Sequence, residues 1–136
     1  MAEKSRPRLA VDCIIELAGQ IVLVRRRNEP LGWALPGGFV DYGETVEAAV
    51  RREVQEETGL ELQDLSQFRV YSDPARDPRG HCVSVIFTAR GTGSLRAGDD
   101  AAAVRLVEPT EPGRLGLVFD HARILADYNA SDSGQA

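Results

Sequence analysis

The segment 38–60 has an unusual distribution of charge around a single predicted helix. At about 100° per residue, Glu53 and Glu57 fall on the same face as the apolar residues of the expected core stripe, and Glu56 falls at its edge. That stripe contains Val46, Ala49, Val50 and Val54, and the opposite, solvated face contains Glu47, Arg51, Gln55 and Thr58. The helix therefore has to place apolar residues and carboxylates on one side.

Those carboxylates need a compensating positive charge. Like charges three and four residues apart repel, and removing a carboxylate from water is costly unless a cation offsets it. An ordinary solvated helix face explains Glu47 but not Glu53 or Glu57. Oxygen ligands without Cys or His favour Mg²⁺ or Mn²⁺ over zinc. The neighbouring Arg52 can orient an acid or reduce the repulsion, although a surface arginine fits the same spacing.

The segment also resembles the Nudix box, a motif of fixed residues at set gaps. The matching residues are Gly38, Glu44, Arg52, Glu53, Val54, Glu56, Glu57, Gly59 and Leu60. The preceding residues 33–37 (WALPG) are similar to the segment that commonly leads into the box. The close resemblance covers residues 20–60, and a looser similarity extends over most of the chain.

The resemblance implies a fold, a reaction and a set of roles. The implied fold is an α/β sandwich of the Nudix α/β/α type with a mixed β-sheet. The implied reaction is Mg²⁺-dependent hydrolysis of a nucleoside diphosphate linked to another moiety, with Mn²⁺ as a substitute ion. The implied catalytic residues are Arg52, Glu53 and Glu56, and the implied metal ligands are Glu53, Glu56, Glu57 and the carbonyl of Gly37, with Glu44 supporting the metal site. Arg52 is expected to position Glu53.

The catalytic base is left open by the sequence. Many members of the family carry an acid after a mobile loop, where this chain has Asp99, Asp100 and then three alanines. Ala103 stands near where a glutamate is expected. Asp99 or Asp100 could take the role, and so could Glu53.

The residues that select the substrate have to lie outside the Nudix box. Segment 71–81 resembles a loop of some ADP-ribose pyrophosphatases, which predicts cleavage of ADP-ribose to AMP and ribose 5-phosphate. Tyr71 could stack on a base, and Arg76 and Arg79 could bind phosphate or ribose oxygens; a proline-stiffened polar turn is the alternative. The predicted substrate-binding residues are Arg25, Arg27, Trp33, Gly38, Tyr71, Arg76 and Arg79. Arg26, between Arg25 and Arg27, also suits a diphosphate. Phe119 and Trp33 could line an adenine pocket, with core packing as the default for Phe119. His121 is expected at the surface or at a helix cap.

Two other functions compete with this prediction. A MutT-type enzyme would release pyrophosphate from a noncanonical nucleoside triphosphate, and a non-catalytic Nudix-like sensor would bind a nucleotide and regulate a partner. The complete set of box acids counts against the sensor. Homodimers are common among similar diphosphatases.

Composition limits the domain organisation and the partners. The chain has 136 residues and a net charge of −5, which favours one domain and a small anionic ligand over a nucleic acid polymer. The expected division is a disordered N-terminus at 1–8, one domain at 9–129 and a disordered tail at 130–136. No apolar run reaches membrane-spanning length, so no membrane partner and a cytoplasmic location are expected. Cys13 and Cys82 are expected to be buried free thiols.

The predicted elements alternate between strands and two helices. A hairpin turns at Ala18 and Gly19, and residues 36–38 are expected to break regular structure. Residues 91–100 are expected to form a mobile loop. Strands are predicted at 9–17, 20–25, 33–35, 67–72, 81–89 and 102–107, and helices at 45–58 and 120–128. Thr45 is the expected N-cap of the first helix and Gly59 its stop. Ile124 and Leu125 of the second helix are expected to face inward.

Overall fold

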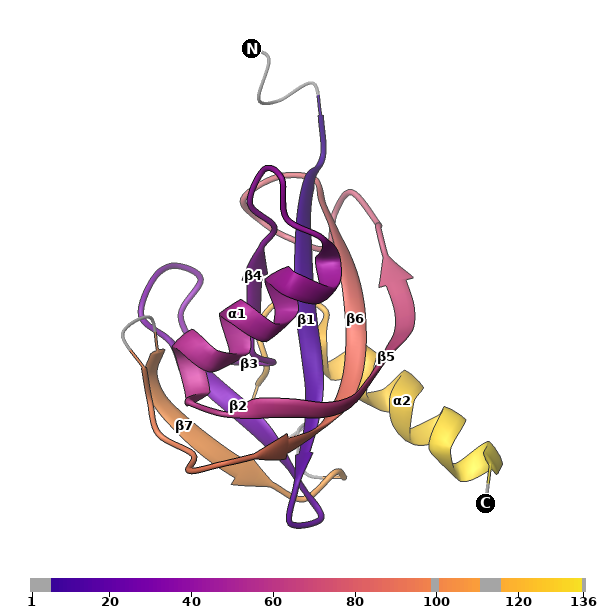
Figure 1. Cartoon of the computed structure of the whole chain (residues 1–136). Helices are drawn as coiled ribbons and strands as arrows, with labels where there is room; N and C mark the ends of the chain where they lie inside the picture. Colours follow the sequence, from indigo (N-terminus) through magenta and orange to yellow (C-terminus); the bar gives the residue numbers. More distant parts are fainter. Residues whose placement is uncertain (1–5, 99–100, 111–115, 136) are drawn as a thin grey trace.

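The computed structural model describes residues 6–98, 101–110 and 116–135, with helix side chains described as far as Ser131. One mixed sheet and two helices form an α/β fold, as the sequence predicts (Figure 1). The elements are β1 (Arg8–Leu17), β2 (Gln20–Arg26), β3 (Trp33–Ala34), β4 (Gly37–Phe39), α1 (Val46–Thr58), β5 (Glu61–Tyr71), β6 (Cys82–Thr92), β7 (Ala101–Val107) and α2 (His121–Gln135).

The sheet has the strand order β3-β2-β1-β6-β5, and β4 and β7 pair with β1 and β2 outside that path. Strands β1 and β6 run parallel, and all the other pairs are antiparallel. The predicted hairpin joins β1 to β2. Ala18 and Gly19 both have positive φ, 53° and 79°, as a tight two-residue turn between strands requires.

The core consists of two apolar clusters, one on each face of the sheet. Alternate residues of β1 point to opposite faces, so Val11 and Cys13 join α1 while Ile14 joins α2. In Figure 1, α1 crosses in front of the sheet and α2 lies behind it. Ile124 and Leu125 of α2 are buried, as predicted. Because Asp12 shares the α2 face of β1, a carboxyl group lies between the apolar residues of that layer.

Helix α1 has the ends that the sequence predicts. The Thr45 hydroxyl accepts a hydrogen bond from the Ala48 N–H, and Gly59 ends the helix in the left-handed conformation at φ 74°. Thr58 is a correction, because it is completely buried rather than solvated. Its hydroxyl donates to the Val54 carbonyl at 2.7 Å, so the helix backbone satisfies the polar group inside the core.

Several boundaries differ from the prediction. Gly37 and Gly38 lie in β4 rather than in an irregular break, because β1 pairs with their backbone. Strand β6 continues to Thr92, through residues expected in a loop, and β5 begins as early as Glu61. Helix α2 continues past Tyr128 to Gln135, into the segment for which a disordered tail is predicted. Pairing with a neighbour lengthens a strand beyond its apolar pattern.

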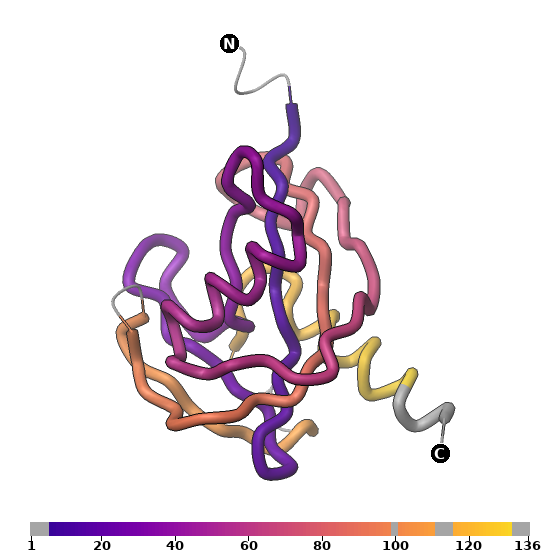
Figure 2. Tube along the Cα trace, viewed as in Figure 1, coloured from indigo at the N-terminus to yellow at the C-terminus, as the bar shows by residue number. Residues whose placement is uncertain are grey.

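The loop between β2 and β3 lies beside the beginning of β7, as the path of the chain in Figure 2 shows. Both cysteines are buried free thiols, as predicted. Among the residues that the structure describes, neither helix combines the length and the apolar character that crossing a membrane requires.

Candidate active site

Two glutamates of α1 face β4 across a short gap. The Glu57 carboxylate accepts a hydrogen bond from the backbone N–H of Gly37, with 2.8 Å between Oε1 and N. Gly38 lies so close to Glu53 that a Cβ atom there would overlap the Glu53 carboxylate. Glycine at position 38 therefore lets the backbone of β4 approach the helix carboxylates.

Arg52 holds three glutamates together at the edge of this gap. Its Nε donates to Glu44 Oε2 at 2.7 Å, and its Nη1 donates to Glu53 Oε1 at 2.7 Å and to Glu56 Oε1 at 3.2 Å. The hydrogen bond from Arg52 lowers the pKa of Glu44 to about 2, and the hydrogen bonds to Glu44 and Glu53 raise the pKa of Arg52. The arginine is thus placed to orient Glu53, the geometry that its predicted role requires.

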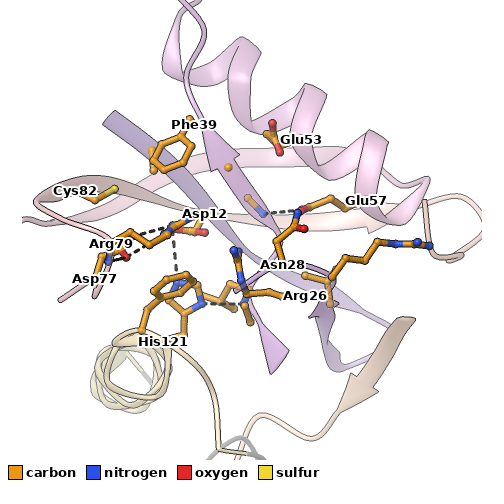
Figure 3. A pocket seen from close by; sticks show the side chains of 18 of the residues that line it. Asp12, Arg26, Asn28, Phe39, Glu53, Glu57, Asp77, Arg79, Cys82 and His121 are labelled. Carbon is orange, nitrogen blue, oxygen red and sulfur yellow. Dashed lines mark hydrogen bonds and ion pairs between the residues drawn. The ribbon is translucent and has the colours of Figure 1, made fainter. Parts of the chain in front are cut away.

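A pocket of about 300 Å³ opens beside these carboxylates (Figure 3). Glu53 and Glu57 line one side, and Arg26 and Arg79 line another. Figure 3 shows His121 at the side of the pocket that lies away from α1. Other lining residues are Asp12, Arg25, Arg27, Asn28, Gly37, Gly38, Phe39, Asp41, Arg76, Asp77, Cys82 and Phe119. The pocket thus combines a carboxylate wall with a cationic wall.

Arg26 is a partly buried arginine of the pocket that contacts backbone carbonyls instead of a carboxylate. Its side chain donates to the backbone carbonyls of Pro30 at 2.8 Å and Glu29 at 3.3 Å. Within the described part of the chain, no carboxylate lies within ion-pair distance of it, whereas Arg76 and Arg79 each have an aspartate partner. Burial, followed by the nearby charge of Arg79, lowers the pKa of Arg26. An anionic ligand would relieve both effects.

The floor of the pocket contains a buried group of polar side chains. Burial raises the pKa of Asp12 to about 7, although a hydrogen bond from the Ser84 hydroxyl opposes that rise. Burial also lowers the pKa of His121 to about 3, so this imidazole is neutral at physiological pH. Its Nδ1 accepts from the Leu35 N–H at 3.0 Å, which places the ring proton on Nε2, 3.8 Å from Asp12 Oδ2.

The loop between β5 and β6 contributes two arginines, each paired with an aspartate. Arg76 Nε and Nη2 donate to the two carboxylate oxygens of Asp120 at 2.9 and 2.7 Å. Arg79 Nε and Nη2 donate to those of Asp77 at 3.1 and 2.8 Å. The loop is thereby joined to the beginning of α2 by a side chain that is only 5% exposed, that of Arg76.

The family comparison agrees with this arrangement. Residues 6–128 match the model of the NUDIX domain. The chain belongs to the Nudix family. It is 48% identical over 125 residues to a Methanocaldococcus jannaschii protein named ADP-ribose pyrophosphatase, covering 90% of this chain and 73% of that protein. It is 36% identical over 104 residues to a Bacillus subtilis protein named putative 8-oxo-dGTP diphosphatase, covering 76% of this chain and 66% of that one.

Solved Nudix structures share the fold over nearly the whole chain. The NUDIX domain of Shewanella oneidensis NrtR, crystallised with ADP ribose, has a TM-score of 0.85 and 26% identity, covering 93% of this chain and 88% of that one. A mutT/nudix family protein from Listeria innocua has a TM-score of 0.76 and 35% identity, covering 96% and 97%. The chain is therefore a Nudix hydrolase by sequence and by fold.

The residues predicted from the Nudix box lie together, and most of those predicted outside it line the pocket. Arg25 and Arg27 line it. Trp33 lies in β3 and lines a neighbouring hollow with Arg25 to Arg27. Tyr71 is a correction: it packs in the apolar cluster beneath α2, and its hydroxyl donates to Asp127 at 2.7 Å. Asp99 and Asp100, the predicted candidates for the base, lie outside the described residues.

Two pocket residues differ from the sequence-based predictions. His121 is a correction, since it is buried beside the pocket rather than at the surface. Asp12 was missed, although a carboxylate inside the apolar run of β1 is a signal that the sequence contains. Phe119 lines the pocket, which was the alternative to core packing. Arg26 also lines it, but the sequence does not distinguish Arg26 from the arginines on either side.

Nudix hydrolases generally need a divalent metal, and the residues present fit one. Glu53, Glu57 and Gly37 all border the pocket and offer only oxygen atoms as ligands, which hard cations prefer. Within the described ranges, no three Asp, Glu, His or Cys side chains are already gathered closely enough to hold an ion. A bound cation would therefore draw these carboxylates closer together.

Proposed function

We propose that this Nudix hydrolase is a Mg²⁺-dependent ADP-ribose pyrophosphatase that releases AMP and ribose 5-phosphate. The observation that carries the proposal is the pocket itself, in which Glu53 and Glu57 stand on one side and Arg26 on another. The guanidinium of Arg26 donates to backbone carbonyls rather than to a carboxylate. A diphosphate needs both a metal-binding wall and a direct cationic contact. The name of the Methanocaldococcus jannaschii relative supports ADP-ribose as the substrate.

The proposed roles follow from the contacts. Glu53, Glu56, Glu57 and the Gly37 carbonyl would hold Mg²⁺, for which Mn²⁺ could substitute. When bound, the metal neutralises diphosphate charge and activates water for attack at phosphorus. Arg52 orients Glu53 and Glu56 through the hydrogen bonds described above, and Glu44 fixes Arg52 from the opposite side. The candidates for the catalytic base are Asp99, Asp100 and Glu53.

Arg26 is proposed as the direct protein contact of the diphosphate, beside the predicted Arg25 and Arg27. A phosphate oxygen near its guanidinium would gain a charge-assisted hydrogen bond without displacing a carboxylate. The hydrogen bonds to the backbone carbonyls of Glu29 and Pro30 would hold the Arg26 side chain in place during this contact. Arg76 is less suited to bind substrate, because Asp120 already occupies its bidentate face.

A substrate panel tests the activity. The purified chain is incubated with ADP-ribose and with canonical and oxidised nucleoside triphosphates, and the products are separated by ion-exchange chromatography. AMP and ribose 5-phosphate should accumulate from ADP-ribose, with kcat/KM higher than for every triphosphate. Pyrophosphate release from a triphosphate as the preferred reaction would instead favour the MutT-type function, to which the name of the Bacillus subtilis relative points.

Metal removal tests the cofactor separately. EDTA should abolish turnover, and Mg²⁺ should restore it, with Mn²⁺ as a second effective ion. Binding of ADP-ribose without turnover in every metal tested would favour the sensor alternative.

The two buried thiols, Cys13 and Cys82, fit a reducing compartment and so support a cytoplasmic location. Light scattering decides whether the enzyme is a homodimer, as similar diphosphatases are.

A further inference from the structure

The segment between β6 and β7 crosses the C-terminal end of α1. The backbone N–H of Arg96 donates to the carbonyl of Thr58 at 3.0 Å, and the N–H of Gly98 donates to the carbonyl of Glu57 at 2.9 Å. Carbonyls in the last turn of a helix have no partner within the helix, so donors from elsewhere have to satisfy them. Figure 1 shows the beginning of β7 near this end of α1. Residues 96–98 therefore cap α1 from a distant part of the sequence.

The last turn of α1 has a charge distribution that makes this cap important. It contains Glu56 and Glu57 and no basic side chain. The C-terminal end of a helix carries a partial negative charge, which disfavours carboxylates there. The N–H groups of Arg96 and Gly98 offset part of that charge at the backbone of the same turn. The cap thus stabilises a turn that carries two of the proposed metal ligands.

Gly98 approaches α1 too closely to carry a side chain. A Cβ atom at this position would overlap the backbone carbonyl of Glu56 and lie 3.3 Å from the Cα of Glu57. Both neighbours belong to the helix backbone, which cannot rotate aside as the end of a side chain can. The φ of Gly98 lies outside the left-handed region, so the close approach, and not the turn, requires glycine here.

The backbone is held on both sides of Gly98. On one side, Arg96 is hydrogen-bonded to Thr58. On the other, the N–H of Ala101 donates to the Gly98 carbonyl at 3.3 Å, and Ala101 is a buried residue of β7 that pairs with Arg26 of β2. The segment is therefore not free to swing away from the helix. A side chain at position 98 would displace the last turn of α1 as well.

We propose that Gly98 is a positioning residue of the metal site, and that its backbone holds the last turn of α1 so that Glu56 and Glu57 face the metal. The inference rests on the proposed function for the identity of these glutamates as metal ligands. Gly98 does not line the pocket and acts through the helix backbone. Glu53 lies one turn earlier and is held by Arg52 instead. The carboxylates of the site thus have two separate supports.

Binding of Mn²⁺ without substrate tests this role. Electron paramagnetic resonance measures the free ion, and so gives the dissociation constants of wild type and Gly98→Ala at a temperature at which both are folded. Gly98→Ala should weaken Mn²⁺ binding by roughly 10- to 100-fold, the range for losing a group that orients metal ligands. Circular dichroism and urea unfolding verify that the variant is folded. An unchanged Mn²⁺ affinity would overturn the proposal.

Two control variants separate positioning from a general loss of stability. Val107→Ala opens a space in the apolar cluster beneath α2, so it should lower the urea midpoint and leave Mn²⁺ affinity unchanged. Ala97→Ser adds one atom to the exposed neighbour of Gly98 and should change neither quantity. Equal weakening of Mn²⁺ binding in Val107→Ala and Gly98→Ala would also overturn the proposal, because metal affinity would then simply follow stability.

Amide hydrogen exchange tests the same coupling in the wild type, without any substitution. If the contact of Gly98 favours metal binding, metal binding must favour the contact, because coupling between two equilibria is reciprocal. Saturation with Mg²⁺ should therefore slow exchange of the Gly98 N–H. The N–H of Arg8, which donates to the His81 carbonyl away from α1, is the reference and should exchange at the same rate with and without Mg²⁺. Equal changes at the two amides, or none at Gly98, would contradict the proposal.

The results for Gly98 and for the proposed activity can be told apart. Weaker Mn²⁺ binding in Gly98→Ala, by a protein that does not hydrolyse ADP-ribose, would refute the activity and keep the positioning role. Hydrolysis of ADP-ribose, with the same Mn²⁺ affinity in wild type and Gly98→Ala, would do the reverse.

Discussion

Glu57 and Gly37 are joined by a hydrogen bond across two elements, from the backbone N–H of β4 to the carboxylate of α1. The bond places a charged group that is 9% exposed beside the pocket rather than in solvent. A carboxylate in that position repels its neighbour Glu53 one turn away. The site is therefore arranged to gain from a bound cation while keeping its backbone fixed.

Glu57→Gln should separate the charge of residue 57 from its structural contact. The amide oxygen can still accept from Gly37, so the thermal midpoint should change little. Loss of a direct metal ligand should cost at least about 100-fold in kcat/KM, the upper end of the effect of perturbing a metal ligand's surroundings. Glu47→Gln, an exposed change on the same helix, is the matched control. Comparable activity in the two variants would refute the assignment of Glu57.

Alanine at the two glycines of β4 should have different effects. A Cβ on Gly37 would overlap the backbone of Val11 and Asp12, so Gly37→Ala should destabilise the fold by about 1–3 kcal/mol or more. The three atoms nearest to a Cβ on Gly38 all belong to the carboxylate of Glu53, at the flexible end of a side chain. Gly38→Ala should therefore keep the thermal midpoint and lose activity. Urea unfolding and steady-state kinetics on both variants check this, and unchanged kinetics in Gly38→Ala would contradict it.

His121 should make the protein less stable in acid. Its pKa is 6.5 in an unfolded chain and about 3 in the folded protein, mainly through burial; the charges of Asp120, Arg76, Arg26 and Asp77 act on it too. Below pH 6.5, His121 binds a proton in the unfolded chain but not in the native state, whose His121 pKa is about 3. The stabilising contribution is therefore complete above pH 6.5 and is lost as the pH falls toward 3, by up to about 1.4 kcal/mol per pH unit.

His121→Asn isolates this contribution. The asparagine side-chain oxygen can replace Nδ1 as the acceptor for the Leu35 N–H, and it does not titrate. Asp12 is present in both proteins and acts in the opposite direction, because its folded pKa is raised. The difference in free energy of unfolding between wild type and variant, measured in urea from pH 7 to pH 4, should fall as the pH falls. A pH-independent difference would contradict the prediction.

Much of the fold was predictable because local patterns determine it. The alternating residues of β1, the caps of α1 and the Ala18–Gly19 turn each depend on residues close in sequence. The position of Glu53 on the same face of α1 as the core residues was predictable for the same reason, because helical geometry alone determines it. The lengths of β4 and β6 were not predictable from local patterns, because the neighbouring strands determine how far the pairing continues.

The floor of the pocket depends on contacts between distant parts of the chain. Arg76 meets Asp120, and His121 meets Leu35, across long stretches of sequence. No local pattern predicts which arginine finds a carboxylate and which does not. The sequence consequently treated Arg25, Arg27, Arg76 and Arg79 alike, whereas the structure distinguishes the paired Arg76 and Arg79 from Arg26.

Arg26 is expected to bind the diphosphate directly, and its replacement should affect KM more than stability. Arg26→Met keeps much of the length and removes the charge. Loss of a hydrogen bond to a charged group costs about 1.5–3 kcal/mol, so KM for ADP-ribose should rise by roughly 10- to 150-fold. Arg105→Met on β7 removes an exposed arginine outside the pocket and should leave KM unchanged. An equal rise in both variants would indicate a general effect of net charge, and no rise in Arg26→Met would remove Arg26 from the substrate site.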